Sequence, residues 1–173
     1  MLDPKLAKRI RLVGFDVDGV MTDGGIYVGV IADQPTEFKR FHIQDGLGVK
    51  MLREAGIVVV LVSARSSEAT EVRAREIKVD EVVHDNKKLP AFESLLARRG
   101  IEWNECAFVG DDLPDLPLLR RVSATSRIAA APPAAAVTRS AETLLKARGV
   151  WDDLVRRYLE QRGDVEARSS RAG

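Results

Sequence analysis

The chain has 173 residues, of which 45% are hydrophobic and 31% are charged, a composition typical of a soluble globular domain. Its formal net charge of +1 argues against nucleic-acid binding and against binding to an anionic membrane. No apolar run approaches the roughly 20 residues that span a bilayer, and the amino terminus lacks the apolar core of a signal peptide. We therefore expect a cytoplasmic protein with one domain over residues 1–162.

Short apolar runs predict the strands, taken in chain order. Ile10–Phe15, Ile57–Val62 and Cys106–Val109 are rich in β-branched, Leu and Phe residues, and each ends at a polar or glycine-containing turn. Such runs are typical of strands that are buried on both faces of a parallel sheet. Two further strands are predicted at Glu81–His84 and near Ser123–Ile128.

Helical patterns lie between and after these strands. The predicted helices are Leu47–Ala55, Ser67–Ile77, Leu89–Arg99, Leu116–Val122, Ala141–Ala147 and Val150–Gln161. Strands that alternate with helices predict βαβ units, and therefore an α/β fold with a doubly wound, Rossmann-like parallel sheet.

Three segments depart from this alternation. Gly24–Phe41 has two extended stretches around the turn-rich Ala32–Pro35, which predicts a β-hairpin that projects from the sheet. Ala129–Ala136 is predicted to be a loop. The polar, arginine-rich residues 163–173 are predicted to be a disordered tail.

Two carboxylates, Asp16 and Asp18, follow the first predicted strand. In open α/β sheets, ligands bind at the carboxyl ends of the strands. Neighbouring carboxylates repel one another unless a cation joins them, and Mg²⁺ prefers such oxygen ligands. The alternative is an ordinary strand-ending turn, because Asp-Gly is a common turn dipeptide.

Further polar residues follow the other predicted strands. Ser63 can donate a hydrogen bond to a phosphate oxygen, or it can cap the next helix. A lysine of the pair Lys87-Lys88 can neutralise phosphate charge, or both can be solvated. The segment Gly110–Asp115 brings three acids to one strand end, where they form either a metal site or a capped turn.

Taken together and in this order, these motifs resemble those of the haloacid dehalogenase superfamily of phosphatases. The four motifs of that superfamily match Asp16 with Asp18, Ser63, Lys88, and Asp111 with Asp115. The stretches 16–24, 26–27 and 41–48 also resemble the small capless subfamily that includes the 3-deoxy-D-manno-octulosonate 8-phosphate phosphatases. In that subfamily the predicted hairpin stands in place of a cap domain.

The resemblance implies roles for these residues. Asp16 would be the nucleophile that forms an aspartyl-phosphate, and Asp18 the general acid and base. Asp16, the Asp18 backbone carbonyl and Asp111 would hold Mg²⁺. Ser63 and Lys88 would bind the phosphoryl oxygens. Asp115, with Asp112, would orient Lys88 or metal-bound water.

The resemblance also implies a homotetramer in which the hairpin of one subunit covers the active site of its neighbour. His42, Asp45 and Arg65 would line the entrance; alternatively, His42 caps or packs and Arg65 pairs with a surface acid. Arg65 and Arg148 would be available to bind a second anionic group, such as the carboxylate of a sugar acid.

The expected function is hydrolysis of a phosphorylated sugar acid. Three alternatives stay open: a nonulosonic (sialic-acid-type) sugar 9-phosphate phosphatase, a phospho-accepting receiver domain, and a non-catalytic tetrameric scaffold.

Overall fold

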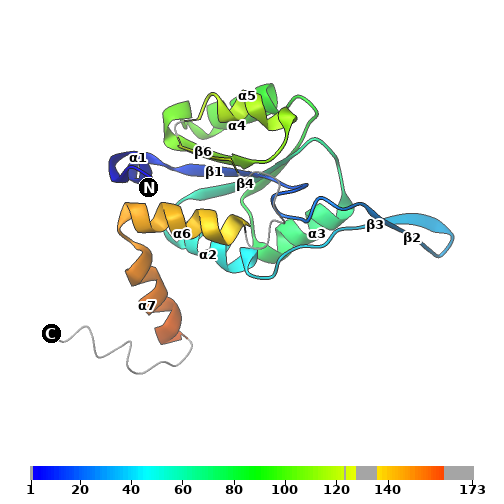
Figure 1. Ribbon diagram of the computed structural model, residues 1–173, viewed down its shortest axis with the longest axis horizontal. Coiled ribbons are helices and arrows are strands. Elements are labelled where there is room, and N and C mark those ends of the chain that lie inside the picture. The colour runs from blue at the N-terminus through cyan, green and yellow to red at the C-terminus, as the bar shows by residue number, and fades with distance from the viewer. Residues whose placement is uncertain (1, 123, 128–135, 162–173) are drawn as a thin grey trace.

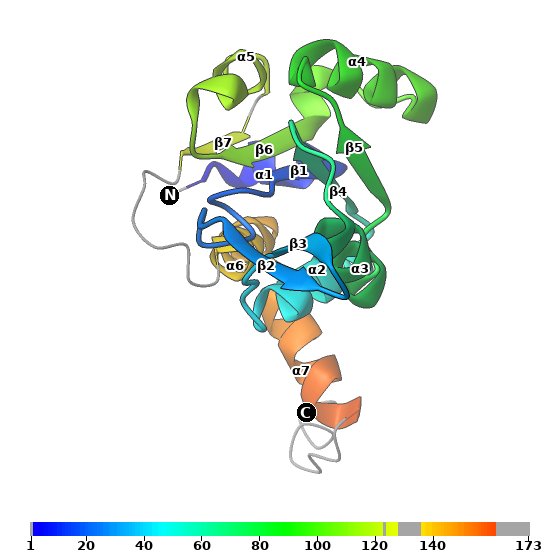
Figure 2. The same ribbon diagram turned by 90° about the vertical axis from the view of Figure 1, so that its right-hand side faces the viewer.

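The structure is a computed structural model that describes residues 2–122, 124–127 and 136–161. Its centre is a parallel sheet of five strands in the order β5-β4-β1-β6-β7 (Figure 2). The strands are β1 (Leu12–Asp16), β4 (Val58–Ser63), β5 (Glu81–His84), β6 (Cys106–Gly110) and β7 (Ala124–Arg127). Each predicted strand is present within about two residues, which confirms the predicted α/β class.

Helices cover both faces of the sheet (Figure 1). One face carries α2, α3 and α6, whereas α4 and α5 lie on the other (Figures 1 and 2). The helices are α1 (Pro4–Arg9), α2 (Asp45–Glu54), α3 (Glu68–Ile77), α4 (Lys88–Arg99), α5 (Leu116–Leu119), α6 (Ala136–Arg148) and α7 (Trp151–Gln161), with 3₁₀ turns η1 (Trp103–Glu105) and η2 (Leu113–Asp115). Among the described residues, no helix has the length and apolar character needed to cross a membrane.

Two apolar cores explain this layering. Successive residues of a strand point to opposite faces, so Val59 and Leu61 of β4 enter the core beneath α2 and α6, whereas Val60 and Val62 enter the core beneath α4 and α5. The side chains of all four are fully buried. Strands buried on both sides therefore appear in the sequence as continuous apolar runs.

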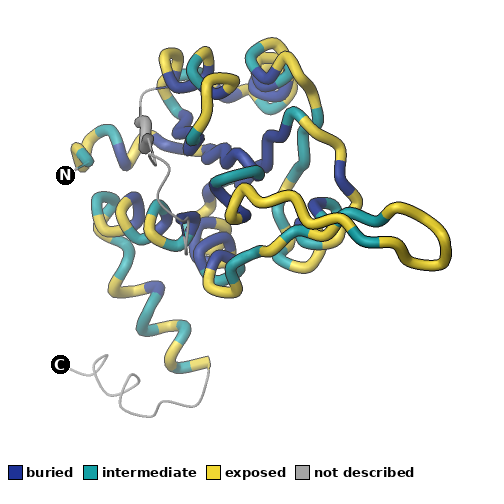
Figure 3. Tube along the Cα trace, turned by 45° about the vertical axis from the view of Figure 1, so that its right-hand side comes forward, coloured by how far each residue is buried: buried dark blue, intermediate teal, exposed yellow. Residues whose placement is uncertain are grey.

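A two-stranded antiparallel hairpin projects from this body (Figures 1 and 3). Its strands are β2 (Tyr27–Ile31) and β3 (Gln34–Phe38). Ala32 and Asp33 between them both have positive φ, at 48° and 61°, as a two-residue type I′ turn requires. Six large apolar residues of the hairpin region are exposed: Ile26, Tyr27, Val28, Val30, Ile31 and Phe38.

The helical predictions differ from the structure in three places. The helix α1 was not predicted, although Asp3 caps its first turn and Pro4 occupies the first helical position. The helix α6 begins at Ala136, five residues before the predicted Ala141, and most of the predicted loop 129–136 lies outside the described residues. The predicted helix 116–122 begins at Leu116 as expected but is shorter, because α5 ends at Leu119. The predicted tail 163–173 also lies outside the described residues.

Candidate active site

The carboxyl edge of the sheet gathers most of the predicted site residues. Asp16 and Ser63 end the neighbouring strands β1 and β4, and Asp16 pairs with Val62 in the parallel register. Gly110 ends β6 on the other side of β1, and the acids of residues 111–115 follow it. Parallel strands place their carboxyl ends at one edge, so residues far apart in the sequence meet here.

Lys88 is the buried cation of this edge. It is the first residue of α4, and its side chain is only 4% exposed. Its ammonium donates to Asp16 Oδ1 and to Asp115 Oδ1, each at 2.7 Å. The pKa of Lys88 is raised, because these two carboxylates outweigh the opposing effect of its burial. Lys87, in contrast, is exposed, so the structure brings Lys88 to Asp16 and leaves its neighbour in solvent.

Asp16, Asp111 and Asp115 form a cluster in which one carboxylate oxygen from each lies within 4.8 Å of the others. The three acids do not have equal freedom to bind a ligand. Asp115 accepts from Lys88 through Oδ1 and from the backbone N–H groups of Asp111 and Asp112 through Oδ2. Asp111 Oδ1, however, is buried and has no hydrogen-bond partner among the described residues. This buried carboxylate oxygen is therefore available to bind a cation.

The charges of this cluster also fit a divalent cation. Burial raises the pKa of the Asp16 carboxyl to about 7, although the Lys88 ammonium acts in the opposite direction. Burial and the nearby Asp115 raise the pKa of Asp111. Gly19, at a φ of 95°, leaves space for Asp111, because a Cβ at residue 19 would lie 1.9 Å from Asp111 Oδ2. The donor set is all oxygen, as Mg²⁺ prefers.

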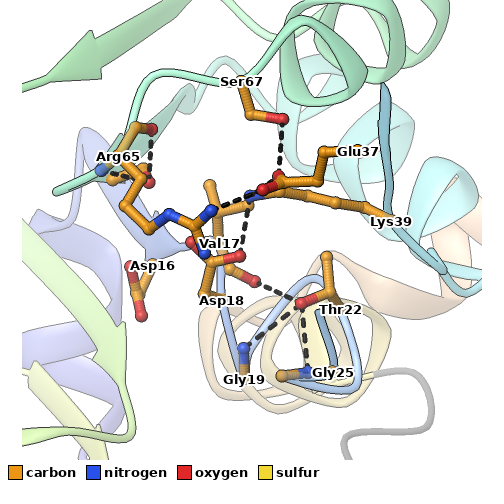
Figure 4. A network of polar contacts seen from close by, with 12 residues as sticks. Asp16, Val17, Asp18, Gly19, Thr22, Gly25, Glu37, Lys39, Arg65 and Ser67 are labelled. Carbon is orange, nitrogen blue, oxygen red and sulfur yellow. Dashed lines mark hydrogen bonds and ion pairs between the residues drawn. The ribbon is translucent and has the colours of Figure 1, made fainter. Parts of the chain in front are cut away.

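The Asp18 side chain lies beside Lys39 at the base of the hairpin (Figure 4). Its Oδ1 accepts a 2.7 Å hydrogen bond from the ammonium of Lys39, whose side chain is 2% exposed. Glu37 of β3 lies 3.8 Å from the same ammonium and also accepts from the Arg65 guanidinium and the Ser67 hydroxyl. A chain of alternating charges therefore joins Asp18 to the loop that follows β4.

Ser63 and Arg65 form a compact turn at the end of β4. The Ser63 hydroxyl donates to the Arg65 carbonyl at 2.9 Å and accepts from the Arg65 backbone N–H at 3.1 Å. The Ser63 side chain is fully buried at the sheet edge, whereas the Arg65 side chain is about half exposed.

Proteins with a sequence similar to this chain are named as phosphatases. No family model matches the chain. The 3-deoxy-D-manno-octulosonate 8-phosphate phosphatase KdsC of Yersinia pestis is 36% identical over 128 residues, which are 73% of this chain and 67% of the relative. The KdsC of Escherichia coli K12 is 34% identical over the same length, which is 66% of that relative. The chain belongs to the KdsC-like family of the haloacid dehalogenase superfamily.

Solved structures of phosphatases from this family have a fold similar to that of the chain. The 3-deoxy-D-manno-octulosonate 8-phosphate phosphatase of Moraxella catarrhalis, in complex with magnesium ion, phosphate ion and KDO, has a TM-score of 0.79 and 31% identity, and the match covers 90% of this chain and 97% of that one. The Yersinia pestis structure has the same TM-score at 30% identity and covers 86% and 88% of the two chains. As a member of the KdsC-like family, the chain is a phosphoric monoester hydrolase.

Several predicted residues of this KdsC-like chain lie apart from the cluster. Asp112 is exposed and caps η2 by accepting from the Leu113 N–H. Asp45 is fully buried, and its Oδ1 accepts from the backbone and hydroxyl of Thr138, which joins α2 to α6. His42 is half-buried and accepts from the Gln44 N–H at 3.3 Å. The entrance roles of Asp45 and His42 stay predictions.

Arg148 lies at the opposite end of β1 from the site. Its guanidinium donates to the backbone carbonyls of Ala7, at 3.0 Å, and Ile10, at 2.6 Å. Ile10 precedes the amino end of β1, whereas Asp16 is at the carboxyl end, and the strand from Leu12 to Asp16 alone spans about 13 Å. Within one subunit, the structure therefore does not bring Arg148 to Asp16.

The sequence reasoning missed Lys39 and Glu37. Both lie in the predicted hairpin, whose polar residues carried no motif. The sequence does hold one indication, because the charged residues of Glu37–Phe41 lie in the segment that leads from the hairpin back to α2. The direction of that return depends on tertiary packing and could not be read from the pattern.

Proposed function

We propose that the chain is a magnesium-dependent phosphatase that hydrolyses a sugar-acid phosphate of the 3-deoxy-D-manno-octulosonate 8-phosphate type. One observation carries the proposal: Lys88 bridges two buried acids next to an unpartnered Asp111 oxygen, in a chain related to an enzyme that contains magnesium, phosphate and KDO. A site with one buried cation, and with acids that can hold a second, is suited to a phosphate group.

Asp16 is the proposed nucleophile. One of its carboxylate oxygens bonds to phosphorus as the ester bond between phosphorus and the sugar oxygen breaks, and the product is an aspartyl-phosphate. Lys88 fixes the Asp16 carboxylate through Oδ1 and presents positive charge to the phosphoryl oxygens. The Ser63 hydroxyl, which donates to the Arg65 carbonyl in this structure, would donate to the same oxygens instead. Asp16, Asp111 and the Asp18 backbone carbonyl would hold Mg²⁺, which supplies positive charge that offsets the repulsion between carboxylate and phosphate.

Asp18 is the proposed general acid and base. Its proton goes to the leaving sugar oxygen, and its carboxylate then takes a proton from the water that attacks phosphorus and releases Asp16. The 35% exposure of its side chain gives access to the leaving group and to water. Asp18 also distinguishes the proposal from a receiver domain, because a long-lived phosphoaspartate has no use for an acid and base at this position.

Arg65 is the proposed contact for the carboxylate of the sugar acid. In this structure its guanidinium pairs with Glu37, so a substrate carboxylate must compete with that side chain. A charge-assisted contact of this kind contributes roughly 1.5–3 kcal/mol, or about 10- to 150-fold in selectivity. A nonulosonate 9-phosphate carries the same carboxylate and belongs in the same test.

A homotetramer is part of the proposal. The hairpin exposes apolar side chains on both strands, with Val30 72% exposed and Val28 69% exposed. A projecting apolar hairpin is better explained by contact with another subunit than by free solvent. Light scattering at micromolar concentration should give four times the mass of one chain, and a monomer would contradict both the tetramer and a site covered by a neighbour. A cytoplasmic location stays a prediction.

The deciding experiment measures phosphate release with Mg²⁺ from three substrates: the octulosonate 8-phosphate, a nonulosonate 9-phosphate and a neutral sugar phosphate of similar size. Asp16→Asn and Asp18→Asn should each lower kcat by at least about 100-fold with an unchanged circular dichroism spectrum. Asp112→Asn is the matched control, because the Asp112 side chain is exposed and an asparagine can still cap η2. Equal kcat/KM for the acid and neutral substrates would refute the sugar-acid class, and an active Asp16→Asn would refute the nucleophile.

A further inference from the structure

His84 joins the turn after β4 to helix α3. It ends β5 and pairs with Ser63 in the parallel register. Its ring has a polar neighbour on each nitrogen: the Arg65 carbonyl lies 3.0 Å from Nδ1, and Glu71 Oε1 lies 2.7 Å from Nε2. The ring is 21% exposed, so these contacts lie at the border of the protein interior.

The Arg65 carbonyl receives two hydrogen bonds that fix the same turn. The Ser63 hydroxyl donates to it from one side at 2.9 Å, and His84 Nδ1 contacts it from β5. Since Ser63 also accepts from the Arg65 N–H, the conformation of this turn and the orientation of the Ser63 hydroxyl are determined together. His84 therefore contacts the carbonyl oxygen that also accepts from the Ser63 hydroxyl.

The chemistry of the two neighbours assigns the protons of the ring. A backbone carbonyl and an ionised carboxylate both accept hydrogen bonds and cannot donate them. Each ring nitrogen must therefore carry a proton for both contacts to be hydrogen bonds, and only the imidazolium form has two N–H groups. A neutral ring keeps one of these bonds and loses the other.

We propose that His84, as the imidazolium, is a positioning residue: it holds the Arg65 carbonyl, so that the Ser63–Arg65 turn keeps its conformation when the Ser63 hydroxyl donates to phosphate in place of that carbonyl. The proposal rests on the proposed function, because it takes Ser63 as a phosphate ligand. The Glu71 carboxylate from α3 contacts the ring, whereas the next residue, Asp85, accepts from the Lys87 N–H and the Arg65 guanidinium is directed to Glu37. Without a proton on Nδ1 the ring cannot donate to the Arg65 carbonyl, the turn loses its support from β5, and phosphate binding weakens.

A matched pair of variants separates the two contacts. The amide nitrogen of His84→Asn lies near the position of Nδ1 and can donate to the Arg65 carbonyl at every pH, whereas that of His84→Gln lies near Nε2 and can reach only Glu71. We expect His84→Asn to bind inorganic phosphate about as tightly as the wild type does at low pH. His84→Gln should bind it roughly 2- to 12-fold more weakly, which corresponds to the loss of one hydrogen bond.

The measurement is calorimetric titration of the full chain with inorganic phosphate in the presence of Mg²⁺, from pH 5.5 to 9. The ionisation of phosphate affects every variant equally, so the ratio of wild-type to His84→Asn affinity isolates the ring. Nitrogen NMR of histidine-labelled protein follows the ring proton directly, and the chain has only two histidines, which makes the assignment simple. The affinity ratio should fall at the pH where the His84 ring signal shows loss of its proton.

Two results would overturn the positioning role while the phosphatase activity stays intact. One is a neutral His84 ring at a pH where phosphate binds fully, and the other is a His84→Gln variant that binds phosphate as His84→Asn does. A wild-type protein that neither binds inorganic phosphate nor releases it from any substrate would instead overturn the proposed function, and the role of His84 with it.

Discussion

Replacement of Lys88 by methionine tests how the buried charges of the site are balanced. Methionine keeps most of the length and apolar volume of the lysine side chain and removes only the ammonium. That ammonium is within 2.7 Å of Asp16 and of Asp115, whose side chains are 6% and 0% exposed. The variant therefore leaves two buried carboxylates without their shared cation.

The expected cost is large for a single substitution. With an effective dielectric constant of about 20, each contact at 2.7 Å is worth roughly 6 kcal/mol before desolvation is subtracted. Removal of one partner from a buried ion pair typically costs about 3–5 kcal/mol, because the remaining charge is left uncompensated. For a chain of this size, the Tm should fall by about 6 to 20 °C.

The assay is urea denaturation at neutral pH, with Lys87→Met as the matched control, because Lys87 is adjacent in the sequence and exposed. The control should lie within about 0.5 kcal/mol of the wild type. Lys88→Met combined with Asp115→Asn should recover part of the lost stability, since one uncompensated charge is removed. If Lys88→Met costs less than about 1 kcal/mol and the second change recovers nothing, the charge balance described above is wrong.

Three further predictions follow from the same structure. Gly19→Ala should weaken Mg²⁺ binding, measured by calorimetry, roughly 10- to 100-fold, because the added Cβ would displace Asp111. The control Gly24→Ala should change Mg²⁺ binding little, because Gly24 also has a positive φ but, among the described residues, a Cβ there would lie no closer than 3.7 Å to any atom beyond its two chain neighbours. Arg148→Ala should lower the free energy of unfolding by about 1–3 kcal/mol and leave kcat/KM unchanged. If the variant instead keeps its stability and loses the preference for the acid substrate, Arg148 belongs to the active site of a neighbouring subunit. Burial raises the pKa of Asp45, so its bound proton stabilises the fold at low pH, and that stability is lost as the pH rises above the ordinary aspartate pKa of about 3.9. In Asp45→Asn the free energy of unfolding, measured by denaturation from pH 4 to 7, should fall less with pH than in the wild type, and an equal fall would contradict the prediction.

The sheet could be predicted because strands that are buried on both faces have continuous apolar sequences. Runs such as Val58–Ser63 are apolar without interruption, and each ends where the chain leaves the core. The sequence pattern at the beginning of α6 is less specific. The residues that precede it are rich in alanine and proline, which suit both a loop and a helix start, so the contact of α6 with α2 decides the boundary.

The two parts of the site differ in predictability for a geometric reason. Asp16, Ser63, Lys88 and Asp111 all follow strands of one parallel sheet, so knowledge of the strands is sufficient to place them at one edge. Lys39 reaches the same edge by another route, since the hairpin leaves the sheet after β1 and returns before α2.

Nothing in the hairpin's own pattern specifies where Lys39 would return, and burial of its ammonium against Asp18 is a property of the assembled fold. A charge that is buried at 2% exposure must be paired, so the pairing of Lys39 with Asp18 and Glu37 joins the base of the hairpin to the proposed acid and base. If the exposed part of the hairpin contacts a second subunit, as we propose, the same strand β3 connects that contact to Asp18. The assembly and the chemistry of this chain would then depend on one element that no catalytic motif marks.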